Sequence, residues 1–126
     1  MKTQQTVILI FVLSLISSSI ANRKHIVKVA PDGELRYEPN YLDIKIGDTV
    51  TWVWEDSFHS VTQGLPGICA RHPMGWDSGY QREKGFIWSI QFDTDKGYAP
   101  GDKIHYFCNV GIHCNQGMKG IISITR

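Results

Sequence analysis

The sequence of 126 residues carries 13 Lys and Arg against 12 Asp and Glu, and its longest run of these basic residues is Arg23-Lys24. Nothing in this charge pattern favours binding to nucleic acid or to an anionic membrane surface, so we expect neither as a partner. The length fits one domain of ordinary size.

The first 21 residues, MKTQQTVILIFVLSLISSSIA, place Lys2 before an apolar run and end in small residues. This order is typical of a secretory signal peptide. The apolar run is shorter than the ~20 residues that span a bilayer, so we expect no transmembrane anchor. We predict a signal peptide over 1–21 and one domain over 22–126. We expect this domain to be an exported monomer, extracellular or, in a bacterium, periplasmic.

The rest of the chain reads as short strands separated by turn residues, with no helical periodicity over a useful length. Segments that alternate apolar and polar residues, or that are rich in β-branched and aromatic residues, occupy 25–30, 41–46, 49–54, 58–62, 86–92, 103–108 and 120–125. This pattern predicts an all-β fold, an antiparallel Greek-key β-sandwich of about seven to eight strands. The segment 64–85, rich in glycine and charge, is predicted to be a long surface connection.

The cysteines make the first link to function. The chain contains three cysteines, Cys69, Cys108 and Cys114, all of them outside residues 1–21. Without residues 1–21 the chain also has equal numbers of basic and acidic residues. In an oxidising compartment cysteines tend to pair. Because three is an odd number, one of them must be free, reactive, intermolecular or bound to a metal.

The stretch 105–120, HYFCNVGIHCNQGMKG, contains a candidate metal site. Cys108, His113 and Met118 offer a thiolate, an imidazole and a thioether at regular spacing, a soft donor set that suits copper. A blue-copper centre needs a second imidazole, and His59, which follows the aromatic segment 49–54, is the best candidate. We expect the remaining histidines not to be ligands: His25, His72 and His105.

Three interpretations of this stretch compete. If Cys108 binds copper, Cys114 beside His113 is badly placed for the same metal and can pair with Cys69. A structural zinc site would instead use Cys108, His113 and Cys114, although the C-x-x-C pairs common in zinc sites are missing. In the third interpretation Cys108 and Met118 are only core residues.

At this point the sequence resembles the cupredoxin family of blue, type 1 copper proteins. The segment 39–61, PNYLDIKIGDTVTWVWEDSFHSV, is similar to its N-terminal half, and 106–120 is similar to its C-terminal copper signature. The spacing C-N-V-G-I-H-C in 108–114 further resembles the phytocyanin and plastocyanin-like subgroup. The resemblance implies one copper ion on His59, Cys108, His113 and Met118, and a disulfide between Cys69 and Cys114.

A centre with four protein ligands leaves no open position for substrate, so we expect an electron carrier and not an enzyme. The chain has no H-x-H pairs of the multicopper oxidase kind. The expected partner is a redox protein that docks near Gly111 and Ile112, or a small-molecule reductant or oxidant. The alternative is an extracellular copper storage or delivery protein with no dedicated redox partner.

Overall fold

A computed structural model describes residues 22–126 except residue 81, so the predicted signal peptide lies outside the described residues. The described chain forms eight strands and two short 3-10 turns: β1 (Lys24–Val29), η1 (Pro31–Gly33), β2 (Tyr37–Glu38), β3 (Tyr41–Ile44), β4 (Thr49–Trp54), β5 (Thr62–Gln63), β6 (Ile87–Gln91), η2 (Thr94–Lys96), β7 (Lys103–Phe107) and β8 (Lys119–Ile124). No helix in this part of the chain is long and apolar enough to cross a membrane.

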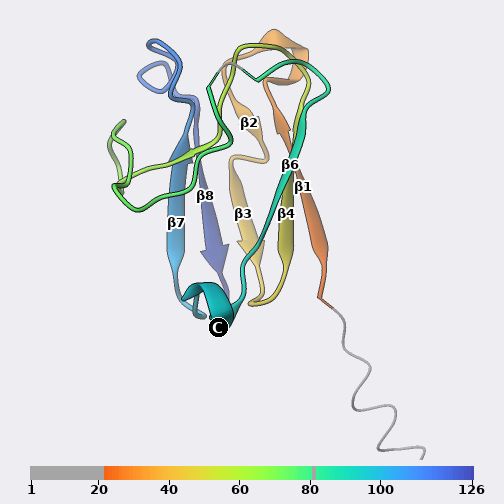
Figure 1. Cartoon of the computed structure of the whole chain (residues 1–126), viewed down its shortest axis with the longest axis vertical. Coiled ribbons are helices and arrows are strands. Elements are labelled where there is room, and N and C mark those ends of the chain that lie inside the picture. Colours follow the sequence, from red (N-terminus) through yellow and green to blue (C-terminus); the bar gives the residue numbers. More distant parts are fainter. Residues whose placement is uncertain (1–21, 81) are drawn as a thin grey trace, which may run out of the picture.

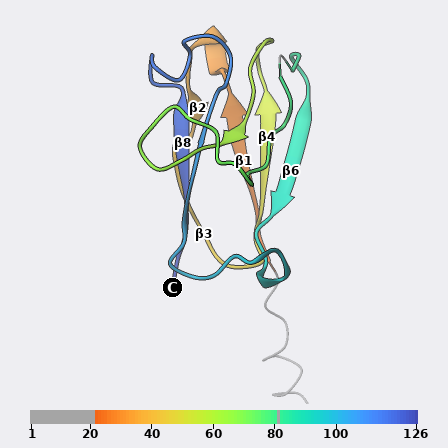
Figure 2. The same cartoon turned by 60° about the vertical axis from the view of Figure 1, so that its left-hand side comes forward.

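The strands form two four-stranded sheets, in the orders β2-β1-β4-β6 and β3-β8-β7-β5. The sheets face each other as two layers (Figures 1 and 2). The β4–β5 and β7–β8 connections both lie at the upper end of the molecule in Figure 1, whereas the C-terminus lies at the lower end. Two connections far apart in sequence thus meet at one end of the sandwich.

The predicted β-sandwich is confirmed, with two differences in detail. First, β1 pairs with β4 and β3 pairs with β8 in parallel, while the other pairings are antiparallel. Second, most of the strand expected over 58–62 is absent. Phe58 has a left-handed backbone (φ 66°), which interrupts an extended chain. His59 is therefore held by a single β-bridge to Arg82, and β5 begins only at Thr62.

The core follows from the alternation of apolar residues along each strand. In β4, the sequence TVTWVW buries every second side chain, ending in Trp52 and Trp54. Trp52 meets Tyr106 of the opposite sheet edge to face, with ring centroids 5.5 Å apart. Tyr106 also meets Tyr37 at 4.8 Å. Large aromatic rings therefore join the two sheets beneath the end that carries the two connections.

At the opposite end of the sandwich, the buried carboxylate of Asp48 joins neighbouring segments by hydrogen bonds. Asp48 accepts hydrogen bonds from the backbone N–H groups of Arg23 (2.9 Å) and Lys45 (3.0 Å), and its other contact is His25 Nε2 at 2.9 Å. Burial alone would raise the pKa of Asp48, but these hydrogen bonds outweigh it and the pKa lies below its usual value. The ionised carboxylate therefore stabilises the fold.

Replacing Asp48 with Asn should lower the free energy of unfolding by about 1–2 kcal/mol at pH 7, since two backbone donors lose an ionised acceptor. Because the pKa of Asp48 is lowered by folding, the carboxylate makes its full contribution to the free energy of unfolding above its pKa in the unfolded chain, about 3.9. This contribution is lost as the pH falls through the pKa in the folded protein. The difference between wild type and D48N, measured by urea unfolding, should therefore shrink towards pH 3. Asp43→Asn, at an exposed position of β3, is the control, and an equal loss in both variants would contradict this role.

Candidate metal centre

Two connections at one end of the sandwich bring together the predicted ligands. His59 comes from the β4–β5 connection, and Cys108, His113 and Met118 come from the segment between β7 and β8. Cys108 follows the last residue of β7 and Met118 precedes the first residue of β8. The backbone N–H of Cys108 donates to the carbonyl of Met118 (3.1 Å), which closes this loop at its base.

Three donor atoms converge inside this end. Sγ of Cys108 lies 3.8 Å from Nδ1 of His59 and 3.5 Å from Nδ1 of His113. The ligand atoms of these three residues all lie within 4.8 Å of one another. Cys108 and His59 are buried, and His113 is half-buried. The donor cluster is thus largely buried, and the half-buried imidazole of His113 is the part of it that reaches the surface.

Met118, at the end of the same loop, is fully buried (0 % exposed). Its backbone N–H donates to the carbonyl of His113 at 3.1 Å, and its carbonyl accepts from Cys108 at 3.1 Å. Both contacts fix Met118 to the loop that carries the other two donors. A methionine thioether is the weak additional ligand that a blue-copper site takes, and the backbone of Met118 is held next to those of Cys108 and His113.

Hydrogen bonds to backbone carbonyl groups hold the segment that carries His59. Its carbonyl accepts a hydrogen bond from Trp54 Nε1 (2.9 Å) and another from the backbone N–H of Arg82 (3.2 Å). Tyr37 OH donates to the carbonyl of the next residue, Ser60, at 2.6 Å. Core aromatic side chains therefore anchor the segment that carries this imidazole.

Ser60 ties the two ligand-bearing segments to each other. Its backbone N–H donates to Sγ of Cys108 (3.4 Å), and its Oγ accepts from the backbone N–H of Asn109 (2.8 Å). Ser60 Oγ also lies 2.9 Å from Thr62 Oγ1, which donates to Asp77 at 3.0 Å. Because Thr62 uses its proton on the carboxylate, Ser60 must donate to Thr62. The sequence left this link in doubt, because the chain has Ser60 where many cupredoxins have Asn after the first histidine ligand, but Ser60 makes the link.

The electrostatics of the enclosed donors favour a protonated thiol and neutral imidazole when no metal is bound. Burial raises the pKa of the Cys108 thiol, an effect that hydrogen bonding from Ser60 partly offsets. Burial, reinforced by the neighbouring His113, lowers the pKa of His59. A metal that binds the thiolate must therefore displace a proton from sulfur, while His59 is already neutral.

The remaining cysteines form a disulfide, Cys69–Cys114, across a sequence separation of 45 residues. This bond joins the segment between β5 and β6 to the ligand loop, and Cys108 remains a free, buried thiol. The zinc interpretation required Cys114 as a thiolate ligand, and the disulfide removes that donor. The interpretation of Cys108 as a simple core residue leaves two imidazole nitrogens facing its sulfur without explanation.

The other histidines lie apart from the cluster. His25 contacts Asp48 at the opposite end of the molecule. Nδ1 of His72 accepts from the backbone N–H of Met74 at 3.1 Å. His105 lines a cavity on the outer face of its sheet. None of these three belongs to the group of potential metal ligands found among the described residues.

The donor set and its spacing fit a first-row transition metal. Bond lengths of about 2.3 Å to sulfur and 2.0 Å to nitrogen, as in zinc sites, place sulfur and nitrogen about 3.7 Å apart at trigonal angles. The observed separations are 3.8 and 3.5 Å. One thiolate and two imidazoles in this arrangement, with a buried methionine on the same loop, match the chemistry of blue-copper sites. Fold and donor set together define the class: a β-sandwich protein with one soft-donor copper site.

Comparison with known proteins agrees with this class. Residues 24–125 match the family described as copper binding proteins, plastocyanin/azurin family. A plastocyanin from Scenedesmus fuscus is 33% identical over 103 residues, which cover 78% of this chain and 96% of that protein. The chain therefore belongs to the plastocyanin/azurin family of cupredoxins, and its cofactor is one type 1 copper ion. The narrower resemblance to phytocyanins stays a prediction.

Solved structures share the fold at low sequence identity. A purple cupredoxin from Nitrosopumilus maritimus superimposes with a TM-score of 0.61 at 19% identity, covering 80% of this chain and 99% of that one. A copper-containing nitrite reductase from Thermus scotoductus gives a TM-score of 0.57 at 22% identity, covering 82% of this chain but 22% of that one. The same fold thus occurs alone and within a longer chain.

Replacing Ser60 with Ala should lower the free energy of unfolding of the metal-free protein by about 1–2 kcal/mol, because the Asn109 N–H and the buried Thr62 hydroxyl each lose a partner. Urea unfolding measures the loss. Ser123→Ala, at a half-buried position of β8, is the matched control and should change stability by less than about 0.5 kcal/mol. A loss no greater than that of the control would contradict the role of Ser60.

Proposed function

We propose that the protein is a carrier of single electrons, with His59, Cys108, His113 and Met118 as the ligands of its copper ion. The observation that carries this proposal is the convergence of a buried thiol and two imidazoles within 4.8 Å. Copper held by such a set changes between Cu(I) and Cu(II), which supplies the one-electron chemistry. The remaining task of the chain is to hold these donors in place.

Enclosure of the donors favours a carrier of electrons over an enzyme or a carrier of copper. Cys108 is 1% exposed, His59 4% and Met118 0%. A substrate would need an open ligand position, and transfer of the ion to another protein would need accessible ligands. The arrangement instead fits a centre whose ligands move little. Export through the signal peptide predicted over 1–21 is part of the same proposal.

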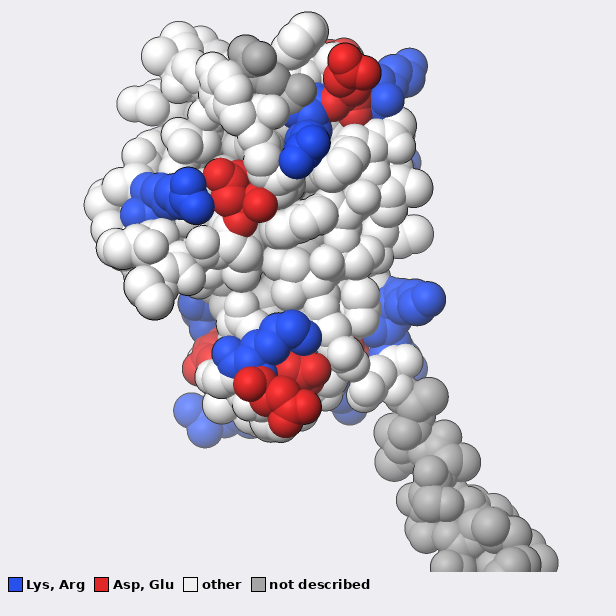
Figure 3. All heavy atoms as spheres, in the orientation of Figure 1, with Lys and Arg blue, Asp and Glu red and all other residues white. Residues whose placement is uncertain are grey.

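The surface around His113 supports docking of a redox partner. Ile112, directly before His113, is 63% exposed, and Phe58, directly before His59, is 59% exposed. No residue of the loop 109–118 is charged. Figure 3 shows an uncharged surface at the upper left, where the β7–β8 connection lies in Figure 1. We infer that partner proteins approach this apolar surface and that electrons pass through the imidazole of His113.

Replacing Ile112 with Glu should slow electron self-exchange about tenfold at low ionic strength, since two copies that meet through this loop would bring like charges together. NMR line broadening in mixtures of the reduced and oxidised protein measures the rate. Ile26→Glu, on β1 with a nearly equal exposure of 62%, is the matched control.

An unchanged rate in I112E, or an equal loss in both variants, would contradict the proposed docking surface. The storage alternative makes a different prediction. Rapid loss of copper to a chelator, together with slow self-exchange of the wild type, would favour that alternative and overturn the electron-carrier proposal.

A further inference from the structure

A cavity of about 300 Å³ lies on the outer face of the sheet that contains β3, β8 and β7. Its floor is a row of three side chains that the strand register places side by side: Tyr41 pairs with Ile121, and Ile121 pairs with His105. Phe107 and Lys119, also a register pair, continue the floor towards the end that carries the metal centre. These residues project away from the core because their neighbours along each strand project into it.

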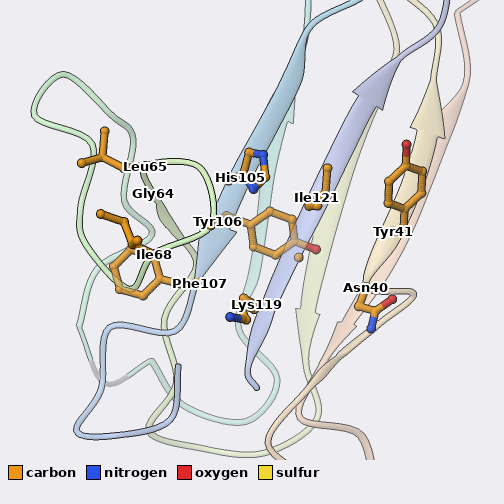
Figure 4. Close-up of a pocket in the computed structure, with 12 residues that line it drawn as sticks. Asn40, Tyr41, Gly64, Leu65, Ile68, His105, Tyr106, Phe107, Lys119 and Ile121 are labelled. Atoms are coloured by element: carbon orange, nitrogen blue, oxygen red, sulfur yellow. The ribbon is translucent and has the colours of Figure 1, made fainter. Parts of the chain in front are cut away.

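The hairpin-like segment 64–71 provides the wall of this cavity through Gly64, Leu65, Gly67 and Ile68, and the side chain of Ile68 lies beside Phe107 (Figure 4). Several contacts hold this wall in place. Gly64 donates from its backbone N–H to the carbonyl of His105 at 2.8 Å, and Leu65 donates to Ala70 at 2.9 Å. A Cβ atom at Gly64 would lie 2.8 Å from the Phe107 ring, so glycine permits this close approach.

The disulfide at Cys69 fixes the same segment to the ligand loop. The cavity is therefore formed before any ligand arrives, which is usual for sites that bind small molecules. Its volume is at the lower end of the range for such sites and matches a ligand of one or two rings. Ile68 and Tyr41 on its borders are 56% and 46% exposed, so apolar surface remains available to a ligand.

The charged residues in and near the cavity indicate which kind of ligand it can bind. Among the described residues that line it, none is acidic, and Lys119 supplies a cation. Lys119 takes part in none of the ion pairs found in the described part of the chain. A second ammonium group, Lys103 Nζ, lies 5.9 Å from the centre of the Tyr41 ring. Aromatic walls beside unpaired cations fit an aromatic ligand with one negative charge.

We propose that this cavity, between the 64–71 wall and the outer faces of β3, β8 and β7, binds a small aromatic carboxylate. The rings of Tyr41, His105 and Phe107 would contact the aromatic part, and Lys119 would pair with the carboxylate. This inference goes beyond electron transfer and does not depend on the metal, because none of the proposed copper ligands lines the cavity.

The test is a titration of the purified metal-free protein with 2-naphthoate, followed by the shifts of backbone amide signals in ¹H–¹⁵N NMR spectra. Saturable shifts should centre on Gly64, Gly67 and Gly120, which line the cavity. The neutral analogue 2-naphthylmethanol should bind at least fivefold more weakly, because one exposed charge pair contributes about 1 kcal/mol, or about fivefold in affinity.

Lys119→Gln should weaken naphthoate binding about fivefold, and Ile68→Asp should abolish saturation. Lys28→Gln, an exposed lysine on the other sheet, is the matched control and should bind like the wild type. Thermal unfolding of each variant checks that the fold is retained. Absence of saturable shifts, shifts centred elsewhere, equal binding of the neutral analogue, or an unchanged affinity in K119Q would each overturn the proposal.

Discussion

The metal centre depends on hydrogen bonds that join the β4–β5 connection to the β7–β8 loop, two segments far apart in sequence. The backbone N–H of Ser60 donates to the sulfur of Cys108, and the Ser60 hydroxyl accepts from Asn109. These two contacts join the segment of His59 to the loop of His113 without any metal. The free energy needed to gather the donors is therefore supplied by folding, and binding of the ion does not have to order the chain.

The sandwich makes this connection possible by placing both segments above one rigid layer of aromatic rings. Trp54 and Tyr37 project from the core and donate hydrogen bonds to the carbonyls of His59 and Ser60. On the far side, the Cys69–Cys114 disulfide holds the outer loop. The same bond also fixes the wall of the outer-face cavity, so one covalent link supports two separate features of the surface.

Much of the arrangement could be predicted from the sequence, because strand alternation and ligand spacing are local signals. The alternation in 49–54 indicated β4, and the spacing of Cys108, His113 and Met118 indicated one loop with three donors. The parallel pairing of β1 with β4 was not predicted, since pairing between distant strands is set by packing of the whole fold. The link made by Ser60 was doubted and not predicted, because it depends on Asn109 and Thr62, which become neighbours of Ser60 only after folding. The cavity was missed for the same reason: its wall and floor come from four separate parts of the chain.

The most direct test of the central claim is the visible absorption spectrum of the protein with one equivalent of Cu(II), recorded beside that of a Cys108→Ala variant. A thiolate bound to Cu(II) in a site of this type gives the intense charge-transfer band that makes blue-copper proteins coloured. The structure predicts this band for the wild type and its loss in the variant, with both proteins folded. A wild-type protein without the band, or a variant that keeps it, would contradict a copper centre built on Cys108.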